Sequence, residues 1–252
     1  GSVQLRGVAI HPAEDESDDD VSNFNYNDSM WQPNYFRLFI SHLSSYKKSA
    51  ANLKACLLKY GIHSFVAHED IKPSKEWEIE IENALFSMNA LCAIVTKEFI
   101  QSEWCDQEIG FALGQKKVVI PIIKDAMPYG FFGKYQAIKS AEGKASEIAK
   151  SVWDTITKNE KTNSRYFSCL VSLILTAQNK PEAICFLDVL DQSSNVSRGA
   201  VDSLYKNWSN NTILNDLSII EKANNIFSKY SIKPLSVTKN SYTLISDDDL
   251  PF

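Results

Sequence analysis

The chain has 252 residues, of which 44% are hydrophobic, and a formal net charge of −5. This length allows either one large domain or a domain of about 150 residues with a smaller unit beside it. The acidic balance and the absence of a dense Lys/Arg block argue against a dedicated nucleic-acid binder. No apolar run approaches the roughly 18 residues of a membrane span, so we expect no membrane segment.

The five cysteines are widely spaced and form no C-x-x-C pair, and the four histidines form no H-E-x-x-H pattern. We therefore expect neither a disulfide framework nor a metal centre. The first residues also lack the basic-then-apolar pattern of a secretory signal. Together these features favour a reducing, cytoplasmic setting.

Residues 1–34 form an acidic segment that is rich in Ser and Asn and has few apolar residues. Such a composition predicts a disordered, solvated tail, and order is expected to begin near Tyr35.

From Tyr35 onward, short apolar runs alternate with segments of helical spacing. Pro121 interrupts the fourth run and predicts a bulge or the end of a strand there. Gly61 is expected to end the first helix. Strands that alternate with helices imply a parallel sheet with right-handed crossovers. The predicted strands are 35–41, 62–67, 90–95, 117–123 and a short one near 135–138, and the predicted helices are 45–60, 75–88, 96–113 and 142–158.

The composition changes after about residue 160, because strand patterns disappear and only helical spacing remains. We therefore divide the chain into the acidic segment 1–34, an α/β domain over 35–160 and a smaller all-helical region over 161–252. Helices are expected in this last region at 165–178, 181–192, 197–207 and 212–230.

In a parallel sheet, ligands bind outside the carboxyl ends of the strands. Four places in the sequence fall at that edge: Ser41 with His42, the loop Glu69–Lys75, the pair Trp104 and Glu108, and the loop 129–136. Each has an ordinary structural interpretation as well. A Ser after a strand is usually a cap, a helical Glu is usually solvated, and a lone Trp usually belongs to a core or an interface.

Trp104 and Glu108 are four residues apart, so a helix places both on one face. A carboxylate beside a large aromatic ring suits a sugar on which positive charge develops. Cys105 lies between them, but no histidine lies nearby in the sequence, so little supports a cysteine nucleophile.

Four stretches together resemble the TIR (Toll/interleukin-1 receptor) domain, in particular its prokaryotic, NAD-consuming type. LFISH at 38–42 resembles the first-strand signature of that family. GIHSFVAHEDIKP at 61–73 resembles its second strand and BB loop, SEWCDQEIG at 102–110 the helix that carries its catalytic glutamate, and VIPI at 119–122 its fourth strand. The resemblance covers about residues 35–155 and leaves the C-terminal helices outside.

The resemblance implies a flavodoxin-like fold with a parallel five-stranded sheet, and cleavage of NAD at the nicotinamide–ribose bond. Glu108 falls on the family's catalytic position and Trp104 on its aromatic position. Ser41, Phe39 and Lys72 are the further candidates for contact with the substrate. NAD is then the substrate, and the reaction requires neither a cofactor nor a metal.

The family also implies self-association through the BB loop (Glu69–Lys75), to which the C-terminal helices are candidates to contribute. Its biological setting would be bacterial antiviral defence. The product would be ADP-ribose or a cyclic ADP-ribose-type signal, depending on what attacks the ribose, and the sequence does not choose between them. Two rival interpretations remain open: a non-enzymatic TIR adaptor that acts through TIR–TIR assembly, and a nucleoside deoxyribosyltransferase-like enzyme.

Overall fold

A computed structural model of the chain describes residues 28–66, 77–139 and 143–236. Its centre is a parallel sheet with the strand order β2-β1-β3-β4-β5, which confirms the predicted α/β class and the five strands. The strands are β1 (Phe36–Ser41), β2 (Ile62–Phe65), β3 (Ala90–Val95), β4 (Val118–Ile123) and β5 (Ile138–Lys139).

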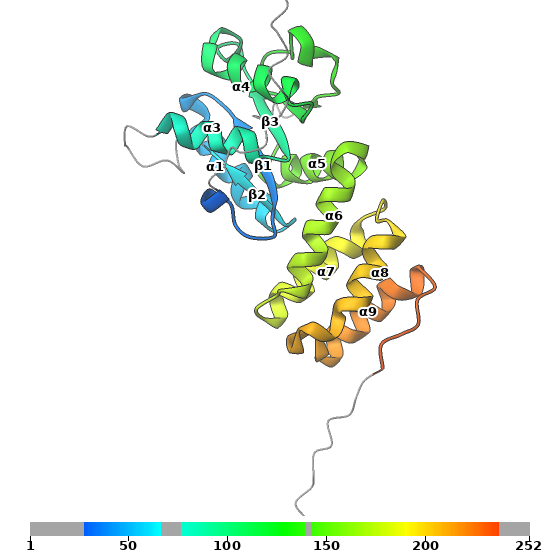
Figure 1. The fold of residues 1–252 in the computed structure, drawn as a ribbon. Helices are drawn as coiled ribbons and strands as arrows, with labels where there is room; N and C mark the ends of the chain where they lie inside the picture. Colours follow the sequence, from blue (N-terminus) through cyan, green and yellow to red (C-terminus); the bar gives the residue numbers. More distant parts are fainter. Residues whose placement is uncertain (1–27, 67–76, 140–142, 237–252) are drawn as a thin grey trace, which may run out of the picture.

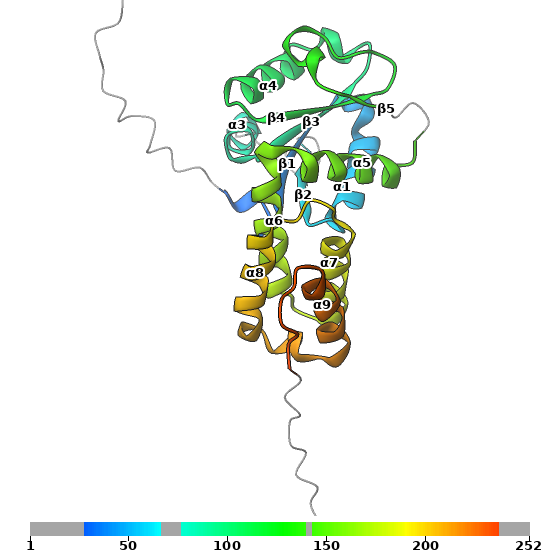
Figure 2. The same ribbon diagram turned by 90° about the vertical axis from the view of Figure 1, so that its right-hand side faces the viewer.

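Helices cover both faces of the sheet. Helices α1 (Lys47–Leu58) and α5 (Ala145–Lys158) pack on one face, and α3 (Trp77–Ser87) and α4 (Glu103–Gly114) pack on the other. Figure 2 shows the strands between these two pairs of helices. Short 3-10 turns lie at Asp28–Met30, Ser44–Tyr46, Phe99–Gln101 and Gly130–Lys134.

The side chains of β1 alternate between the two faces, as the pleat of a strand requires. Leu38 and Ile40 enter the core beneath α1 and α5, whereas Phe39 enters the core beneath α3 and α4. Ser41 follows Phe39 on the same side and is the last residue of the strand. The alternation therefore turns the Ser41 hydroxyl toward α4.

Local signals set the ends of several elements where the sequence predicts them. Gly61 has a φ of 70°, and a Cβ there would lie 2.8 Å from Leu173, so both its backbone and its space favour glycine. The Thr96 hydroxyl accepts a hydrogen bond from the Phe99 N–H, and the Ser102 hydroxyl accepts one from the Cys105 N–H. The segment after β3 is thus a short 3-10 turn followed by the helix α4, which Ser102 caps.

Pro121 lies inside β4 rather than at a bulge or a strand end, so that prediction was wrong. Its register opposite Ala93 of β3 is continuous with the pairs on either side. The other neighbour, β5, pairs only with Ile122 and Ile123. Beside Pro121, β4 is therefore an edge strand, which is a position where a sheet tolerates proline.

Ordered structure begins earlier than Tyr35. Trp31 is buried against the core beneath α3 and α4, and its indole Nε1 donates a 2.8 Å hydrogen bond to the Ser87 hydroxyl. The sequence prediction missed this anchor because a single tryptophan in a polar segment has no periodicity. The rest of the acidic segment, residues 1–27, lies outside the described residues.

Four further α-helices follow the sheet, namely α6 (Glu160–Leu175), α7 (Lys180–Gln192), α8 (Arg198–Asn207) and α9 (Leu217–Lys229). Two 3-10 turns, Trp208–Asn210 and Thr212–Asn215, connect α8 to α9. Figure 1 shows these helices gathered beyond one end of the sheet, with α6 leading away from α5. None of the described helices is long and apolar enough to cross a membrane.

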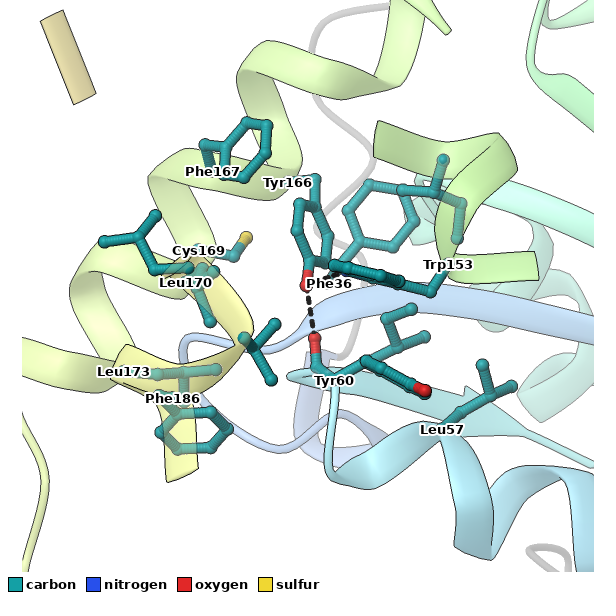
Figure 3. Packing of buried hydrophobic residues seen from close by; sticks show 14 of the residues in the cluster. Phe36, Leu57, Tyr60, Trp153, Tyr166, Phe167, Cys169, Leu170, Leu173 and Phe186 are labelled. Atoms are coloured by element: carbon teal, nitrogen blue, oxygen red, sulfur yellow. Dashed lines mark hydrogen bonds between the residues drawn. The ribbon is translucent and has the colours of Figure 1, made fainter. Parts of the chain in front are cut away.

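The helical region shares one continuous core with the sheet. Tyr166 of α6 is fully buried; its hydroxyl donates a 2.6 Å hydrogen bond to the Tyr60 carbonyl and accepts a 2.8 Å bond from the indole of Trp153. Its ring meets Phe36 edge-on, with centroids 5.9 Å apart (Figure 3). Because Phe36 begins β1 and Tyr60 lies two residues before β2, α6 docks on the amino-terminal edge of the sheet. The boundary predicted at residue 160 is therefore not a break in the core, and the three domain ranges stay a prediction.

We predict that Tyr166→Phe lowers the free energy of unfolding by about 1–3 kcal/mol, because a buried carbonyl and a buried indole N–H each lose their partner. Urea denaturation measures this loss. Tyr205→Phe is the matched control, since the Tyr205 ring packs against Phe227 at the partly exposed surface of the helical region. Equal stability of the Tyr166→Phe variant and the wild type would contradict the role given to this hydroxyl.

Candidate functional site

The candidate site lies where the sheet changes its winding direction. Strands β1 and β3 are neighbours, but the chain leaves β1 for α1 on one face and leaves β3 for α4 on the other. The loops after the two strands therefore diverge at the carboxyl edge. In open α/β sheets this divergence creates the crevice in which ligands bind.

Ser41 and Glu108 meet at this point. The Ser41 hydroxyl donates a 2.5 Å hydrogen bond to Oε2 of Glu108. Both residues are buried: Ser41 is 1% exposed and Glu108 is 8% exposed. The structure therefore joins two of the residues that the sequence proposed, which lie 67 positions apart.

Burial of Glu108 changes its acidity. Loss of water around the carboxyl group raises its pKa from an ordinary value of 4.5 to about 7, against the opposing effect of the hydrogen bond from Ser41. The group is thus balanced between its acid and carboxylate forms near neutral pH. A buried carboxyl group with a shifted pKa at a switch point is typical of functional sites.

Trp104 lies one helical turn before Glu108. The buried stripe of α4 consists of Cys105, Glu108, Ile109 and Ala112, and Trp104 borders it. The Trp104 side chain is 48% exposed, which is unusual for so large an apolar group. It is therefore accessible to a ligand or to another protein.

Cys105 is close to the Ser41–Glu108 pair, but its thiol is poorly suited to act as a nucleophile. Burial raises its pKa to about 11; the nearby Ser102 and Ser41 hydroxyls oppose this rise, and the Glu108 charge adds to it. The thiol is therefore protonated at neutral pH, and only the thiolate is a strong nucleophile. This agrees with the low weight that the sequence gave to a cysteine mechanism.

The loop after β4 is tied to the helix that carries Glu108. The Tyr129 hydroxyl donates a hydrogen bond to Oδ1 of Asp106, and burial together with this carboxylate raises the pKa of Tyr129. The sequence indicated the loop 129–136 but not Asp106. The sequence carries no signal for Asp106, because its contact with Tyr129 depends on how the loop folds back onto α4.

Phe39 does not lie where the sequence placed it. Its side chain is fully buried and packs on Phe65, with ring centroids 5.4 Å apart. The alternation of β1 puts Phe39 beneath Ser41 in the core, so the ring supports the site and does not contact a ligand at the edge. His42 is also buried, and its Nδ1 lies 3.1 Å from the Ile40 carbonyl.

The predicted contact at Lys72 and the loop Glu69–Lys75 lie outside the described residues. Within the described part of the chain, no group of three or more His, Cys, Asp or Glu side chains is arranged to hold a metal ion. The described residues of this edge bring together a carboxyl group, a hydroxyl and an exposed indole ring.

The doubly wound sheet with a carboxyl group at its switch point defines a class of α/β domains, and comparison with known proteins gives the family. Residues 38–181 match the sequence profile of the TIR domain, so the chain belongs to the TIR domain family. A similar solved structure is the TIR domain of the Toll-related receptor TRR-2 from Hydra magnipapillata. It shares 18% sequence identity, with a TM-score of 0.38, and the alignment covers 46% of this chain and 90% of that one. No curated protein matches the chain.

We predict that the pH dependence of stability reports the burial of Glu108. Its pKa is raised on folding, so folding is most favoured below pH 4.5 and this contribution is lost as the pH rises toward about 7. The shift corresponds to at most about 3 kcal/mol. Relative to Glu108→Gln, which cannot ionise, the wild type should lose stability across this window in urea denaturation.

Glu103→Gln is the matched control, because Glu103 is exposed on the first turn of the same helix. Its stability should follow that of the wild type with pH. A constant difference between the wild type and Glu108→Gln from pH 4.5 to pH 8 would contradict the raised pKa.

Proposed function

We propose that this chain cleaves NAD between nicotinamide and its ribose, with Glu108 as the catalytic carboxylate. The observation that carries the proposal is the buried Glu108 carboxyl group, hydrogen-bonded to Ser41 at the switch point of a TIR domain. Some families of this domain cleave NAD, and others act as scaffolds. A scaffold has no need of a buried carboxyl group with a pKa near 7, because such burial destabilises the fold at neutral pH.

The reaction matches what a fixed carboxylate can do. As the ribose C1′–nitrogen bond breaks, its electron pair moves to the nicotinamide ring, which leaves as a neutral base. The ribose carbon then carries oxocarbenium-like positive charge. An ionised Glu108 next to the ribose stabilises that charge where it forms, and Ser41 keeps the carboxylate in place through its hydrogen bond.

We expect the exposed ring of Trp104 to cover the ribose or the base and to keep water from the reacting carbon. Capture of that carbon by water releases a proton and gives ADP-ribose. Capture by a group of the same ADP-ribose gives a cyclic product and also releases a proton. Contacts of Lys72 with the pyrophosphate stay a prediction.

Self-association belongs to the same proposal. Four apolar side chains near α4 and the loop after β4 are exposed, which favours contact with another protein surface. Their exposed fractions are 38% for Ile100, 48% for Trp104, 68% for Met127 and 85% for Phe131. We propose that copies of the chain assemble around this edge and the loop Glu69–Lys75, in the setting of bacterial antiviral defence.

Incubation of concentrated protein with NAD, followed by chromatography of the products, tests the function. Wild-type protein should release nicotinamide, and Glu108→Ala should reduce the rate at least 100-fold because the charge at the ribose is lost. Glu103→Gln should retain the wild-type rate, since Glu103 is solvated. In a parallel incubation, free 2′-deoxyinosine supplied together with adenine should remain intact.

Each of the other possible results would contradict a different part of the proposal. No nicotinamide from assembled wild-type protein would leave the scaffold interpretation. Exchange of the base of 2′-deoxyinosine for adenine would favour the deoxyribosyltransferase-like interpretation. Equal rates for the wild type and Glu108→Ala would remove Glu108 from the mechanism.

The pH profile gives a second prediction. If Glu108 acts in its ionised form, kcat/KM for NAD rises with pH through a midpoint at about pH 7 and levels off at higher pH. The Ser41 hydrogen bond lowers the pKa of Glu108, so Ser41→Ala should move the midpoint to higher pH. A Ser41→Ala profile with an unchanged midpoint would contradict the coupling between the two side chains.

A further inference from the structure

Two hollows lie next to each other at the amino-terminal edge of the sheet, at the opposite ends of the strands from Glu108. One has a volume of about 210 Å³ and lies between the starts of β1 and β4 and the first turns of α6. The other has a volume of about 200 Å³ and lies between the start of β1 and the middle of α6. Arg165 lines both, so they form neighbouring parts of one concave surface.

The charge of this surface is opposite to that of the chain as a whole. Lys116, Lys117, Lys161 and Arg165 line the first hollow, and Arg37 joins Arg165 in the second. No Asp or Glu side chain is among the described residues that line either hollow. In a chain with a net charge of −5, such a concentration of positive charge favours an anionic ligand.

Two of these cations repel each other through their place on the helix. Lys161 and Arg165 are four residues apart in the first turns of α6, so their side chains share one face. A like-charge pair at this spacing destabilises a helix, and the positive end of the helix dipole adds to the unfavourable charge. An anion bound between the two side chains would relieve both effects.

The turn before β4 contributes Lys117 to the lining of the first hollow. Its side chain is half-buried, and this burial lowers its pKa. An isolated surface lysine would extend into water instead. Next to it, Lys116 has a φ of 55°. The turn before β4 therefore contributes two consecutive lysines, Lys116 and Lys117, to the lining of the same hollow.

The second hollow offers groups of a different kind. Asn34, Ser168 and Ser172 supply an amide and two hydroxyls, and Tyr35 supplies an aromatic ring at its wall. Hydrogen-bonding groups and a ring are what a sugar and a base require. The first hollow instead supplies four cations and the Asn89 amide to a phosphate, because the hydroxyl of Thr162, which also lines it, already donates to the Ile156 carbonyl.

We propose that this surface binds a small phosphate-bearing ligand of nucleotide size. Its phosphates lie on Lys116, Lys117, Lys161 and Arg165, and its nucleoside extends past Arg165 toward Tyr35. Such a ligand bridges the start of β4 and α6. It therefore stabilises the docking of the helical region on the sheet, without contact with Glu108.

Isothermal titration calorimetry with ADP tests the proposal. Lys161→Gln combined with Arg165→Gln keeps side-chain length and helix propensity while it removes two charges, and should weaken ADP binding at least tenfold. Arg198→Gln combined with Lys206→Gln on α8 is the matched control and should bind as the wild type does. Amide NMR shifts induced by ADP should centre on residues 116–118 and 161–165.

Pyrophosphate and a single-stranded RNA serve as further ligands, which show whether the surface recognises phosphate alone, a nucleotide or a nucleic acid. Pyrophosphate that binds as tightly as ADP to the same amides, with the same loss in the double variant, would assign the phosphate subsite alone and overturn the nucleoside part. Unchanged ADP affinity in the double variant, or shifts confined to Ser41 and residues 104–108, would overturn the site. So would a single-stranded RNA that binds through these residues while ADP does not.

Discussion

The adjacency of β1 and β3 is the constraint on which the rest of the molecule depends. Ser41 stands opposite Ala93 in that pairing, so the end of β1 is held beside the segment that leads into α4. The chain then leaves the two strands on opposite faces, and the alternation of β1 turns the Ser41 hydroxyl toward α4. The hydrogen bond to Glu108 follows from this arrangement, and so does the burial that raises the pKa of Glu108.

The burial of Glu108 beside Ser41 lowers the stability of the fold at neutral pH, but it keeps a carboxyl group with a raised pKa at the edge of the sheet. An ionised carboxylate in the core is unfavourable unless it is fully hydrogen-bonded, and one hydroxyl satisfies only part of its capacity. The fold retains it at the carboxyl edge, while α6 packs around Tyr166 at the opposite edge and α7, α8 and α9 extend the same core. The five steps from Phe36 to Ser41 separate the two edges by about 17 Å. The helical region is therefore placed to stabilise the sheet or to sense a ligand, and not to supply groups to Glu108.

Periodicity and turn residues were enough to predict the sheet, its helices and the α-helical C-terminal region, because each element carries its own apolar pattern. They could not predict that Pro121 sits within β4, since that depends on how short β5 is. Nor could they place Trp31, which is fixed by one tertiary contact. Among the site residues, Ser41 and Glu108 were predictable from their strand and helix positions. Phe39 was misplaced because the alternation of β1 buries it, and Asp106 was missed because its partner Tyr129 is distant in the sequence.

The position of NAD relative to Glu108 tests the central claim most directly. A crystal structure of the Glu108→Gln variant soaked with NAD should place the hydroxyls of the nicotinamide ribose within hydrogen-bonding distance of the substituted side chain. Trp104 should lie against the ribose or the base. NAD bound away from the carboxyl edge of β1 and β3, with the side chain at position 108 still enclosed beside Ser41 and out of reach of the ribose, would contradict the account.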